Sequence, residues 1–577
     1  MKKLMKYLKG YEKETVLGPL FKLFEALLEL FVPLIVASII DRGIGGGDRG
    51  YIVKMCLLLV GLGALGLAAS VTAQYFAARA AVGHAAAVRS ALVSHIGKMS
   101  YSDLDRAGES SLITLMTNDV NQVQSGINLA LRLLLRSPFI VFGAMIMAFF
   151  VDSSSALIFA ATISALAVVV FGIMLATMPI YTKIQRSLEG VLGKTRENLT
   201  GARVIRAFCR EEEENLEFDR RNRILTSAQK LAGRISSLMN PLTYVIVNIA
   251  IIVLLSDGSV RVDSGDLTQG DVVALYNYMT QISVELIKMA SLIILLTKSA
   301  ASARRISAEL ETPVGMSAPH AAPTGESASE YAVEFRGVSM KYPGAAANSL
   351  EGLSIAVRRG ESIGVIGGTG SGKTTLVNLI PRFYDATEGE VLVDGINVKD
   401  YPTDVLRSKI GVVPQKASLM RGSLRDNLKF GREEASDKEL LEAASLAQAG
   451  EVIAGKGGLD GKVEENGRNF SGGQRQRLTV ARALARNPEI LILDDSSSAL
   501  DYATDAALRR AIAHLPEKPV TFIVSQRASS VRHADRIIVL EDGRVAGIGS
   551  DAELMASCPV YREIVESQSE GRAKENA

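Results

Sequence analysis

Six long apolar stretches constrain the fold of this chain more than any other feature. Each approaches or exceeds the ~20 residues that a bilayer-spanning helix needs. Six are too many for the buried core of a soluble helical protein, so we expect an all-α transmembrane domain over residues 1–310. The expected spans are about 17–44, 53–82, 129–151, 155–180, 240–256 and 271–298.

Positive charge predicts the orientation of these spans. The segment 181–240 carries twelve Lys and Arg residues, whereas the short connections 41–50, 152–155 and 257–270 carry three together. Because Lys and Arg accumulate on the cytosolic side, 181–240 and 83–128 are predicted to be cytosolic, together with both termini. The basic start, residues 1–14, reads as an amphipathic lead-in rather than as a signal peptide.

The two cytosolic segments are predicted to form long helical arms. Both contain few helix breakers, and about 25 residues in each direction would reach ~35 Å beyond the membrane at ~1.5 Å per residue. Residues 100–120 and 208–222 are the candidate tips. Arms of this length are suited to mechanical coupling with a cytosolic domain.

One ionisable pair lies within the sixth expected span. Glu285 and Lys288 are three residues apart and therefore share a helix face. Ionisable groups at membrane depth usually face a cavity or each other. Two interpretations stay open, namely a role in a substrate path and a structural or interfacial pair.

Composition excludes several other classes of function. The net charge of +2 predicts no nucleic-acid partner. The three cysteines, Cys56, Cys209 and Cys558, have no metal-binding or redox spacing, and they are typical of a chain without structural disulfides.

A second domain is expected after residue 330. Residues 311–330 are rich in Pro, Ala, Ser and Gly without apolar periodicity, which predicts a linker. From 331 to 577, short β-branched runs alternate with helical segments, which indicates an α/β domain.

This second domain begins with a phosphate-binding motif. The stretch SIGVIGGTGSGKTTLVNLI (362–380) reads as a strand, a glycine loop and a helix, and it matches G-x-x-x-x-G-K-[ST]. Backbone N–H groups of such a loop surround phosphate oxygens. Lys373 is expected to reach the β- and γ-phosphates of a nucleotide, and the Thr374 hydroxyl to bind Mg²⁺. ILILDD (490–495) then ends a buried strand at Asp494, which is expected to bind Mg²⁺ through water.

A third motif completes a recognisable order. FSGGQRQRLTVARAL (470–484) opens a helix with Ser471, Gly472 and Gly473, which gives another anion site. The order GGTGSGKTT, VVPQ, FSGGQRQR, ILILDD and SALD resembles the ATP-binding cassette (ABC) family. With six spans in front, residues 1–565 resemble a half-transporter of the ABC exporter class, in which the cytosolic arms swap onto the motor domain of a partner chain.

The resemblance implies a role for each matched residue. ATP would be bound by an adenine-stacking aromatic, the glycine loop and the glutamine of VVPQ: Tyr342, Gly367, Gly368, Thr369, Gly370, Ser371, Gly372, Lys373, Thr374, Thr375 and Gln415. Mg²⁺ would be held by Thr374, Gln415 and, through water, Asp494. The signature that contacts the ATP of a partner chain would be Ser471, Gly472, Gly473 and Gln474. The loop that crosses the dimer would be Ser498, Ala499, Leu500 and Asp501.

Two positions depart from the family pattern. Asp495 stands where the family has a Glu that polarises the attacking water, and Gln526 stands where a histidine contacts the γ-phosphate. The shorter Asp carboxylate is retracted by over ~1 Å, whereas a general base must come within about 3 Å of its proton. Gln526 offers hydrogen bonds but no titratable proton. The site is therefore expected to bind ATP and to hydrolyse it poorly.

These departures predict one subunit of a heterodimeric exporter. Its SGGQ motif would complete the competent site of a second half-transporter chain that supplies the Glu and the His. A homodimer with two slow sites, a nucleotide-gated or regulatory protein, and an importer of chelated metals on the exporter fold are the alternatives. The sparse polarity of the spans favours amphipathic or lipid-like cargo. The family architecture indicates a bacterial inner membrane, with membrane lipids as surroundings.

Overall fold

The chain forms two compact units in a computed structural model, which describes all residues except 1, 314–315, 317–328, 497–499 and 576–577. One unit comprises Met1–Gly97 and Ser110–Thr312, and the other comprises Lys98–Glu109 and Pro313–Ala577. Most of the expected linker, 311–330, therefore lies outside the described residues, as do Ser498 and Ala499.

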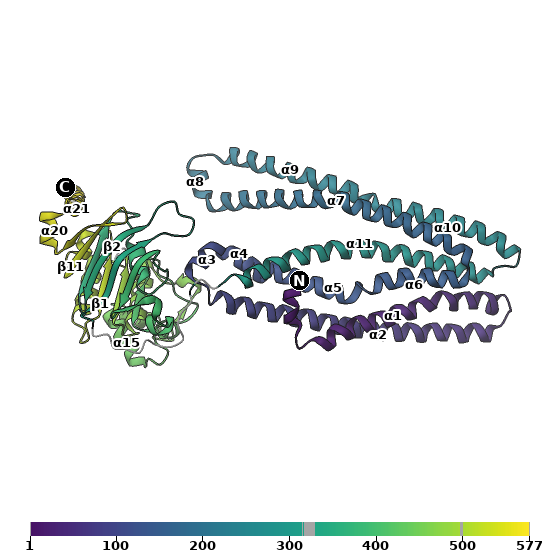
Figure 1. Cartoon of the computed structure of the whole chain (residues 1–577), viewed down its shortest axis with the longest axis horizontal. Helices are drawn as coiled ribbons and strands as arrows, with labels where there is room; N and C mark the ends of the chain where they lie inside the picture. The colour runs from purple at the N-terminus through teal and green to yellow at the C-terminus, as the bar shows by residue number, and fades with distance from the viewer. Residues whose placement is uncertain (1, 314–315, 317–328, 497–499, 576–577) are drawn as a thin grey trace. The chain divides into compact units, whose positions relative to one another are not determined.

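The described secondary-structure elements of the first unit are all helices. Six segments among the described residues are long and apolar enough to cross a membrane. In order they are Glu12–Ile44, Arg49–Ile96, Glu109–Val151, Ser153–Thr200, Glu211–Asp263 and Gln269–Glu311. Long neighbouring helices run side by side, for instance α1 with α2 and α7 with α9 (Figure 1).

Several of these segments are interrupted. The elements are η1 (Lys2–Leu8), α1 (Glu12–Ser38), η2 (Ile39–Ile44), α2 (Arg49–Ile96), α4 (Glu109–Thr114), η3 (Leu115–Asp119), α5 (Val120–Leu133), α6 (Arg136–Val151), α7 (Ser153–Thr200), α8 (Ala202–Ala207), α9 (Glu211–Ser237), α10 (Met239–Asp263) and α11 (Gln269–Glu311). Side-chain caps mark where the long helices begin: Asp48 accepts from the N–H of Tyr51, and Thr268 forms a capping box with Asp271.

Small residues let the first two spans approach closely. The buried face of α2 is a row of alanines that includes Ala73 and Ala77, and Gly18 of α1 lies against their backbone. The bundle core is filled by larger side chains of α11, and the hydroxyl of the fully buried Tyr278 donates to the carbonyl of Leu30 at 2.7 Å.

A buried ionic cluster joins α1, α6 and α11. Arg136 donates to Glu285 and to Glu29, each at 2.7 Å. Glu285 also accepts from the Ser137 hydroxyl at 2.7 Å and from Lys288 at 2.9 Å. Glu285 is 3% exposed and therefore depends on these donors instead of water. The ion pair of Glu285 with Lys288 on one helix face is thus present, and Arg136 joins the two in one cluster.

The second unit contains a six-stranded and a four-stranded sheet in the part that the structure describes. The larger has the order β12-β11-β3-β10-β9-β6 and is parallel except at β12. The smaller, antiparallel sheet has the order β2-β1-β4-β5. The strands are β1 (Tyr331–Met340), β2 (Leu350–Arg358), β3 (Ser362–Gly367), β4 (Glu388–Val393), β5 (Ile396–Asn397), β6 (Ile410–Val413), β9 (Ile490–Asp494), β10 (Val520–Val524), β11 (Arg536–Glu541) and β12 (Arg544–Gly549).

The helices of the second unit are short. They include α12 (Lys373–Leu379), α13 (Thr403–Ser408), α14 (Leu424–Lys429), α15 (Asp437–Leu446), α16 (Gly450–Ala454), α17 (Gly472–Leu484), α18 (Tyr502–Ala513), α19 (Ala528–Val531), α20 (Asp551–Ser557) and α21 (Pro559–Glu575). The predicted fold class, a six-helix transmembrane domain followed by an α/β cassette domain, is confirmed.

One element of the second unit comes from the first third of the chain. Helix α3 (Tyr101–Ala107) begins with a capping box between Ser100 and Asp103. The ring of Tyr101 lies 4.6 Å from that of Phe383, between centroids, and the hydroxyl of Tyr384 donates to Asp105 at 2.7 Å. Burial and the Asp105 carboxylate both raise the pKa of Tyr384 above its ordinary range.

Candidate functional site

The glycine loop follows β3 and lies at the carboxyl edge of the parallel sheet. Val524 pairs with both Asp494 and Val365, so the ends of β3, β9 and β10 meet there. Gly370 and Gly372 have φ values of +83° and +96°, a region that L side chains rarely adopt. A Cβ on Gly367 would lie 2.1 Å from the carbonyl oxygen of Leu540, so the loop also needs glycine for space.

Lys373 lies in the centre of this loop. Its ammonium donates to the carbonyls of Gly367 at 2.9 Å and Gly368 at 2.6 Å, and the residue is 8% exposed. Burial lowers the pKa of Lys373, while the carboxylates of Asp495 and Asp494 act in the opposite direction. The loop therefore holds a largely buried cation that can bind phosphate oxygens, and two acids lie beside it, where a metal ion could separate them from the phosphates.

Thr374 and Asp494 bring two oxygen atoms together across the loop. The Thr374 hydroxyl donates to Asp494 Oδ1 at 3.1 Å, and Asp494 is 5% exposed. Burial raises the pKa of Asp494, and the negative charge of Asp495 adds to that effect. A hydroxyl and a carboxylate are hard oxygen ligands of the kind that Mg²⁺ takes, so these residues fit the ion.

A cavity of about 340 Å³ collects residues from all these motifs. It is lined by Ser349, Thr369, Gly370, Gly372, Lys373, Thr374, Thr375, Gln415, Asp494, Asp495, Val524, Ser525 and Gln526. Both departures from the family pattern, Asp495 and Gln526, therefore share one cavity with the glycine loop. The sequence did not predict Ser349 or Val524 as site residues, and Ser525 stood only as the residue that precedes Gln526.

Backbone contacts hold the two departing positions. Asp495 has a φ of +47°, and its N–H donates to the carbonyl of Val524 at 2.9 Å. The carbonyl of Gln526 accepts from the side chain of Gln568 in α21 at 2.8 Å. The side-chain oxygen of Gln568 accepts in turn from the N–H of Ala528. The C-terminal helix thus fastens the loop that carries Gln526.

Tyr342 lies beside the cavity rather than in its wall. Its hydroxyl is 3.1 Å from the Thr375 hydroxyl, and its ring meets that of Tyr384 edge to face, with 5.0 Å between centroids. The aromatic predicted to stack on adenine is therefore in contact with the glycine-loop helix and with the ring that binds α3.

The SGGQ segment forms the start of α17 and contributes no residue to the wall of this cavity. Ser471 and Gln474 form a capping box, with the Gln474 N–H donating to the Ser471 hydroxyl at 3.3 Å. A Cβ on Gly472 would meet nothing within 4 Å, so that position is open. In the loop that was expected to cross the dimer, Leu500 is 8% exposed, and Asp501 caps α18 by accepting from the Thr504 N–H at 2.9 Å.

Comparison with known proteins identifies the family. The ABC transporter transmembrane region matches residues 15–286, and the ABC transporter domain matches residues 350–498. The chain is 34% identical to the "Uncharacterized ABC transporter ATP-binding protein Rv1273c" of Mycobacterium tuberculosis, with 98% of each chain covered. It is 28% identical to the "ATP-dependent lipid A-core flippase" of Chromobacterium violaceum, over 98% of this chain and 96% of that one.

A solved structure shares the fold. The "Structure of a bacterial Atm1-family ABC exporter with ATP bound" has a TM-score of 0.82 at 23% identity, and the match covers 96% of this chain and 99% of that one. The cassette domain implies ATP binding and ATPase activity, and the six spans make the chain a multi-pass membrane protein. The chain belongs to the ABC transporter family, as an exporter half-transporter in which a transmembrane domain is fused to one cassette.

Proposed function

We propose that this chain is one subunit of a heterodimeric ABC exporter and that its own ATP site binds nucleotide but hydrolyses it slowly. The observation that carries the proposal is the presence of Asp495 and Gln526 in the same cavity as Lys373 and Asp494. The binding groups and the two altered groups thus surround one ligand position. Two substitutions within one cavity indicate a changed role of the site more readily than two unrelated, neutral substitutions would.

The chemistry of each altered side chain favours slow turnover. Asp495 has one methylene fewer than Glu, and a misplacement of ~1 Å in a catalytic group can cost on the order of 10²-fold in rate. The Gln526 amide accepts and donates hydrogen bonds. It carries no positive charge that could pair with the γ-phosphate. ATP binding would depend on the glycine loop and on Lys373, whose ammonium lies within this loop beside the carbonyls of Gly367 and Gly368.

Mg²⁺ would be held at the same edge of the sheet. Thr374 and Asp494 supply the hydroxyl and the carboxylate, with Gln415 in the wall of the same cavity. The ion would neutralise charge on the β- and γ-phosphates. The protein's part is to fix these oxygens and to hold Lys373 beside them.

The partner would be a second half-transporter that carries Glu and His at the two positions. The start of α17, with Ser471 and Gly472 exposed and Gly473 half-buried, is the surface that would complete the partner's site. Dimerisation would thus give one slow and one competent ATP site.

Amphipathic or lipid-like molecules are the proposed cargo, and a bacterial inner membrane with cytosolic termini and cassette is the proposed location. The relative from Chromobacterium violaceum is named as a lipid A-core flippase, and one from Bacillus subtilis, 30% identical over 98% of each chain, as a putative multidrug export protein. The excess of Lys and Arg in 181–240 supports this orientation.

The test compares ATP binding with ATP hydrolysis by the full chain alone in lipid nanodiscs. We expect Mg-ATP to bind while turnover stays near background. Lys373→Ala serves as the control, because it removes the ammonium at the glycine loop and should abolish binding. Robust turnover by the wild-type chain would refute the slow site and favour a homodimer.

A second experiment isolates the side-chain chemistry. Asp495→Glu combined with Gln526→His should raise turnover in the chain paired with its partner, while leaving the affinity for ATP nearly unchanged. An unchanged rate in the assembled pair would contradict the role assigned to these two positions.

A further inference from the structure

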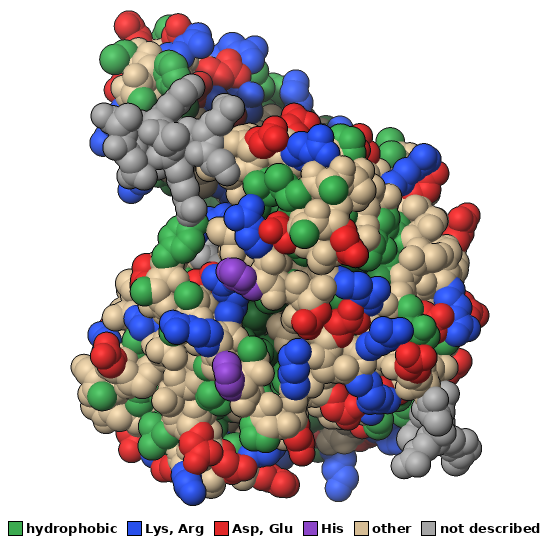
Figure 2. All heavy atoms as spheres, turned by 90° about the vertical axis from the view of Figure 1, so that its left-hand side faces the viewer, with side chains coloured by type: hydrophobic (Ala, Val, Ile, Leu, Met, Phe, Trp, Pro, Cys, Tyr) green, Lys and Arg blue, Asp and Glu red, His purple; other side chains and the backbone are tan. Residues whose placement is uncertain are grey.

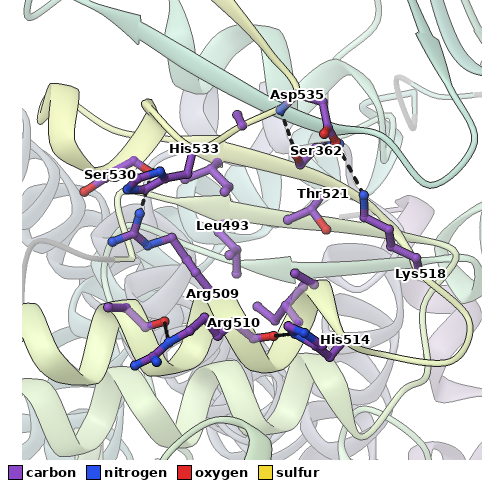
Figure 3. Close-up of a pocket in the computed structure, with 15 residues that line it drawn as sticks. Ser362, Leu493, Arg509, Arg510, His514, Lys518, Thr521, Ser530, His533 and Asp535 are labelled. Carbon is purple, nitrogen blue, oxygen red and sulfur yellow. Dashed lines mark hydrogen bonds and ion pairs between the residues drawn. The ribbon is translucent and has the colours of Figure 1, made fainter. Parts of the chain in front are cut away.

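A second cavity of the cassette unit lies away from the glycine loop. It has a volume of about 440 Å³ and is bounded by α18, by strands β9 and β10, and by the segment after α19 (Figure 3). Its size is within the range of small-molecule sites. The apolar part of its wall consists of Leu493, Ala506, Ile512, Ala513, Ile523 and Ala534.

The polar part of the wall carries more positive than negative charge. Arg509, Arg510, His514, Lys518 and His533 contribute nitrogen atoms, whereas Asp535 contributes the carboxylate of this wall. Figure 3 shows these side chains on two sides of the cavity, and Figure 2 shows two histidine side chains at the edge of a hollow. The wall therefore combines an apolar surface with an excess of donors.

Internal contacts leave part of this positive charge uncompensated. Arg509 is held by Asp505 at 3.0 Å, and Asp535 accepts from Ser362 at 2.7 Å and pairs with Lys518 at 3.4 Å. In the ion pairs of the described residues Arg510 has no acidic partner, and its Nε donates to the carbonyl of Ala506 at 3.3 Å. Arg510 is exposed, so its guanidinium is available to an external anion.

The cavity shares its strands with the ATP site. Leu493 pairs with Ile523 across β9 and β10, and the next pair along the strands is Asp494 with Val524. Leu493 and Ile523 line this cavity, whereas Asp494 and Val524 line the nucleotide cavity. A molecule that packs on Leu493 and Ile523 would therefore contact the same strands that position Asp494 and Val524.

We propose that this cavity is a binding site for a small organic anion with an apolar body, such as an aromatic or branched carboxylate. The apolar wall would bury the body of the ligand, and Arg510 would bind its charged group. Through β9 and β10 the occupied site adjusts the rate of ATP hydrolysis.

The binding test uses 4-(trifluoromethyl)benzoate and its neutral counterpart 4-(trifluoromethyl)benzamide, followed by ¹⁹F NMR line broadening. The full chain in nanodiscs is compared with empty nanodiscs, which removes the contribution of lipid partitioning. We expect the carboxylate to bind about tenfold more tightly than the amide, since an added charged contact worth ~1.4 kcal/mol is a factor of ten. Equal affinities of the two probes would overturn the proposal.

Three variants locate the bound molecule. Ala513→Trp fills the cavity from an exposed wall position and should abolish the binding of both probes. Arg510→Gln should remove most of the preference for the carboxylate. Arg336→Gln, an exposed arginine of β1, is the matched control and should leave both affinities unchanged. Carboxylate binding that survives Ala513→Trp would place the molecule elsewhere and refute the site.

The coupling to the ATP site is measured separately. The carboxylate should change the ATPase rate of the pair formed with the partner chain at least twofold, and Ala513→Trp should remove that response. Specific binding with an unchanged rate would refute the coupling through β9 and β10. The binding readout does not depend on whether the chain's own ATP site is slow, because it needs no turnover, whereas the rate readout rests on the proposed pairing with a partner chain.

Discussion

Removing one member of the buried ionic cluster should destabilise the helical unit strongly. Glu285→Leu deletes the acceptor of Arg136, Ser137 and Lys288, which lie at 2.7, 2.7 and 2.9 Å from its carboxylate oxygens. The Arg136 side chain is 9% exposed and, among the described residues, would keep only the ion pair with Glu29, whose side chain is 40% exposed. Removing one partner of a buried ion pair typically costs about 3–5 kcal/mol.

The double variant should recover most of that loss. Arg136→Met with Glu285→Leu replaces the buried pair by apolar side chains of similar volume, an exchange that is often neutral. The coupling between the two substitutions is therefore expected to be at least about 2 kcal/mol, in the direction that favours the double variant.

Thermal unfolding followed by circular dichroism at one fixed scan rate is the assay, because membrane proteins often unfold irreversibly. The single variants should unfold roughly 10 °C lower than wild type, and the double variant within a few degrees of it. Glu217→Gln, in a partly exposed cluster with Arg220 and Arg221, is the control and should hardly shift the transition. Additive losses in the double variant would refute the reasoning.

Three further outcomes are expected. Tyr384→Phe should weaken the attachment of α3 by about 1.5–3 kcal/mol, because the lost hydrogen bond to Asp105 has a charged acceptor. Faster limited proteolysis near residue 101 would show the weaker attachment, and an unchanged cleavage rate would contradict it. The pKa of Tyr384 is raised in the folded state, so the stability that this hydroxyl contributes should be lost as pH rises above the ordinary tyrosine value of about 10. Hydrogen exchange at α3 should become faster over this pH range in wild type but not in Tyr384→Phe. Ser471→Ala should cost about 1 kcal/mol at the start of α17, visible as faster amide exchange there, whereas Ser471→Thr should restore protection.

Hydropathy and motif order predicted the fold class, because long apolar runs and a strand–glycine loop–helix pattern are local properties of a sequence. The residues at the edge of the large sheet also gather as their motifs suggest. Parallel strands bring their carboxyl ends together, so the positions of Lys373, Asp494 and Gln526 in one cavity follow from strand order.

Contacts between distant segments were not predictable in this way. The same-face spacing of Glu285 and Lys288 is visible in the sequence, but Arg136 lies 149 residues from Glu285 and no periodicity relates them. The contact of Tyr101 with Phe383 depends likewise on tertiary packing. Tyr342 has the expected motif position, yet its contacts with Thr375 and Tyr384 could be seen only in the folded cassette.

The attachment of α3 to the cassette bears on how this chain can be divided for experiments. A fragment that begins at Pro313 would lack Lys98–Glu109, although these residues belong to the same compact unit. It would expose the ring faces of Phe383 and Tyr384 that Tyr101 covers, and it would leave the Tyr384 hydroxyl without Asp105. Such a fragment would expose an aromatic patch that favours aggregation. Adding a peptide with the sequence of residues 98–109 should improve its solubility.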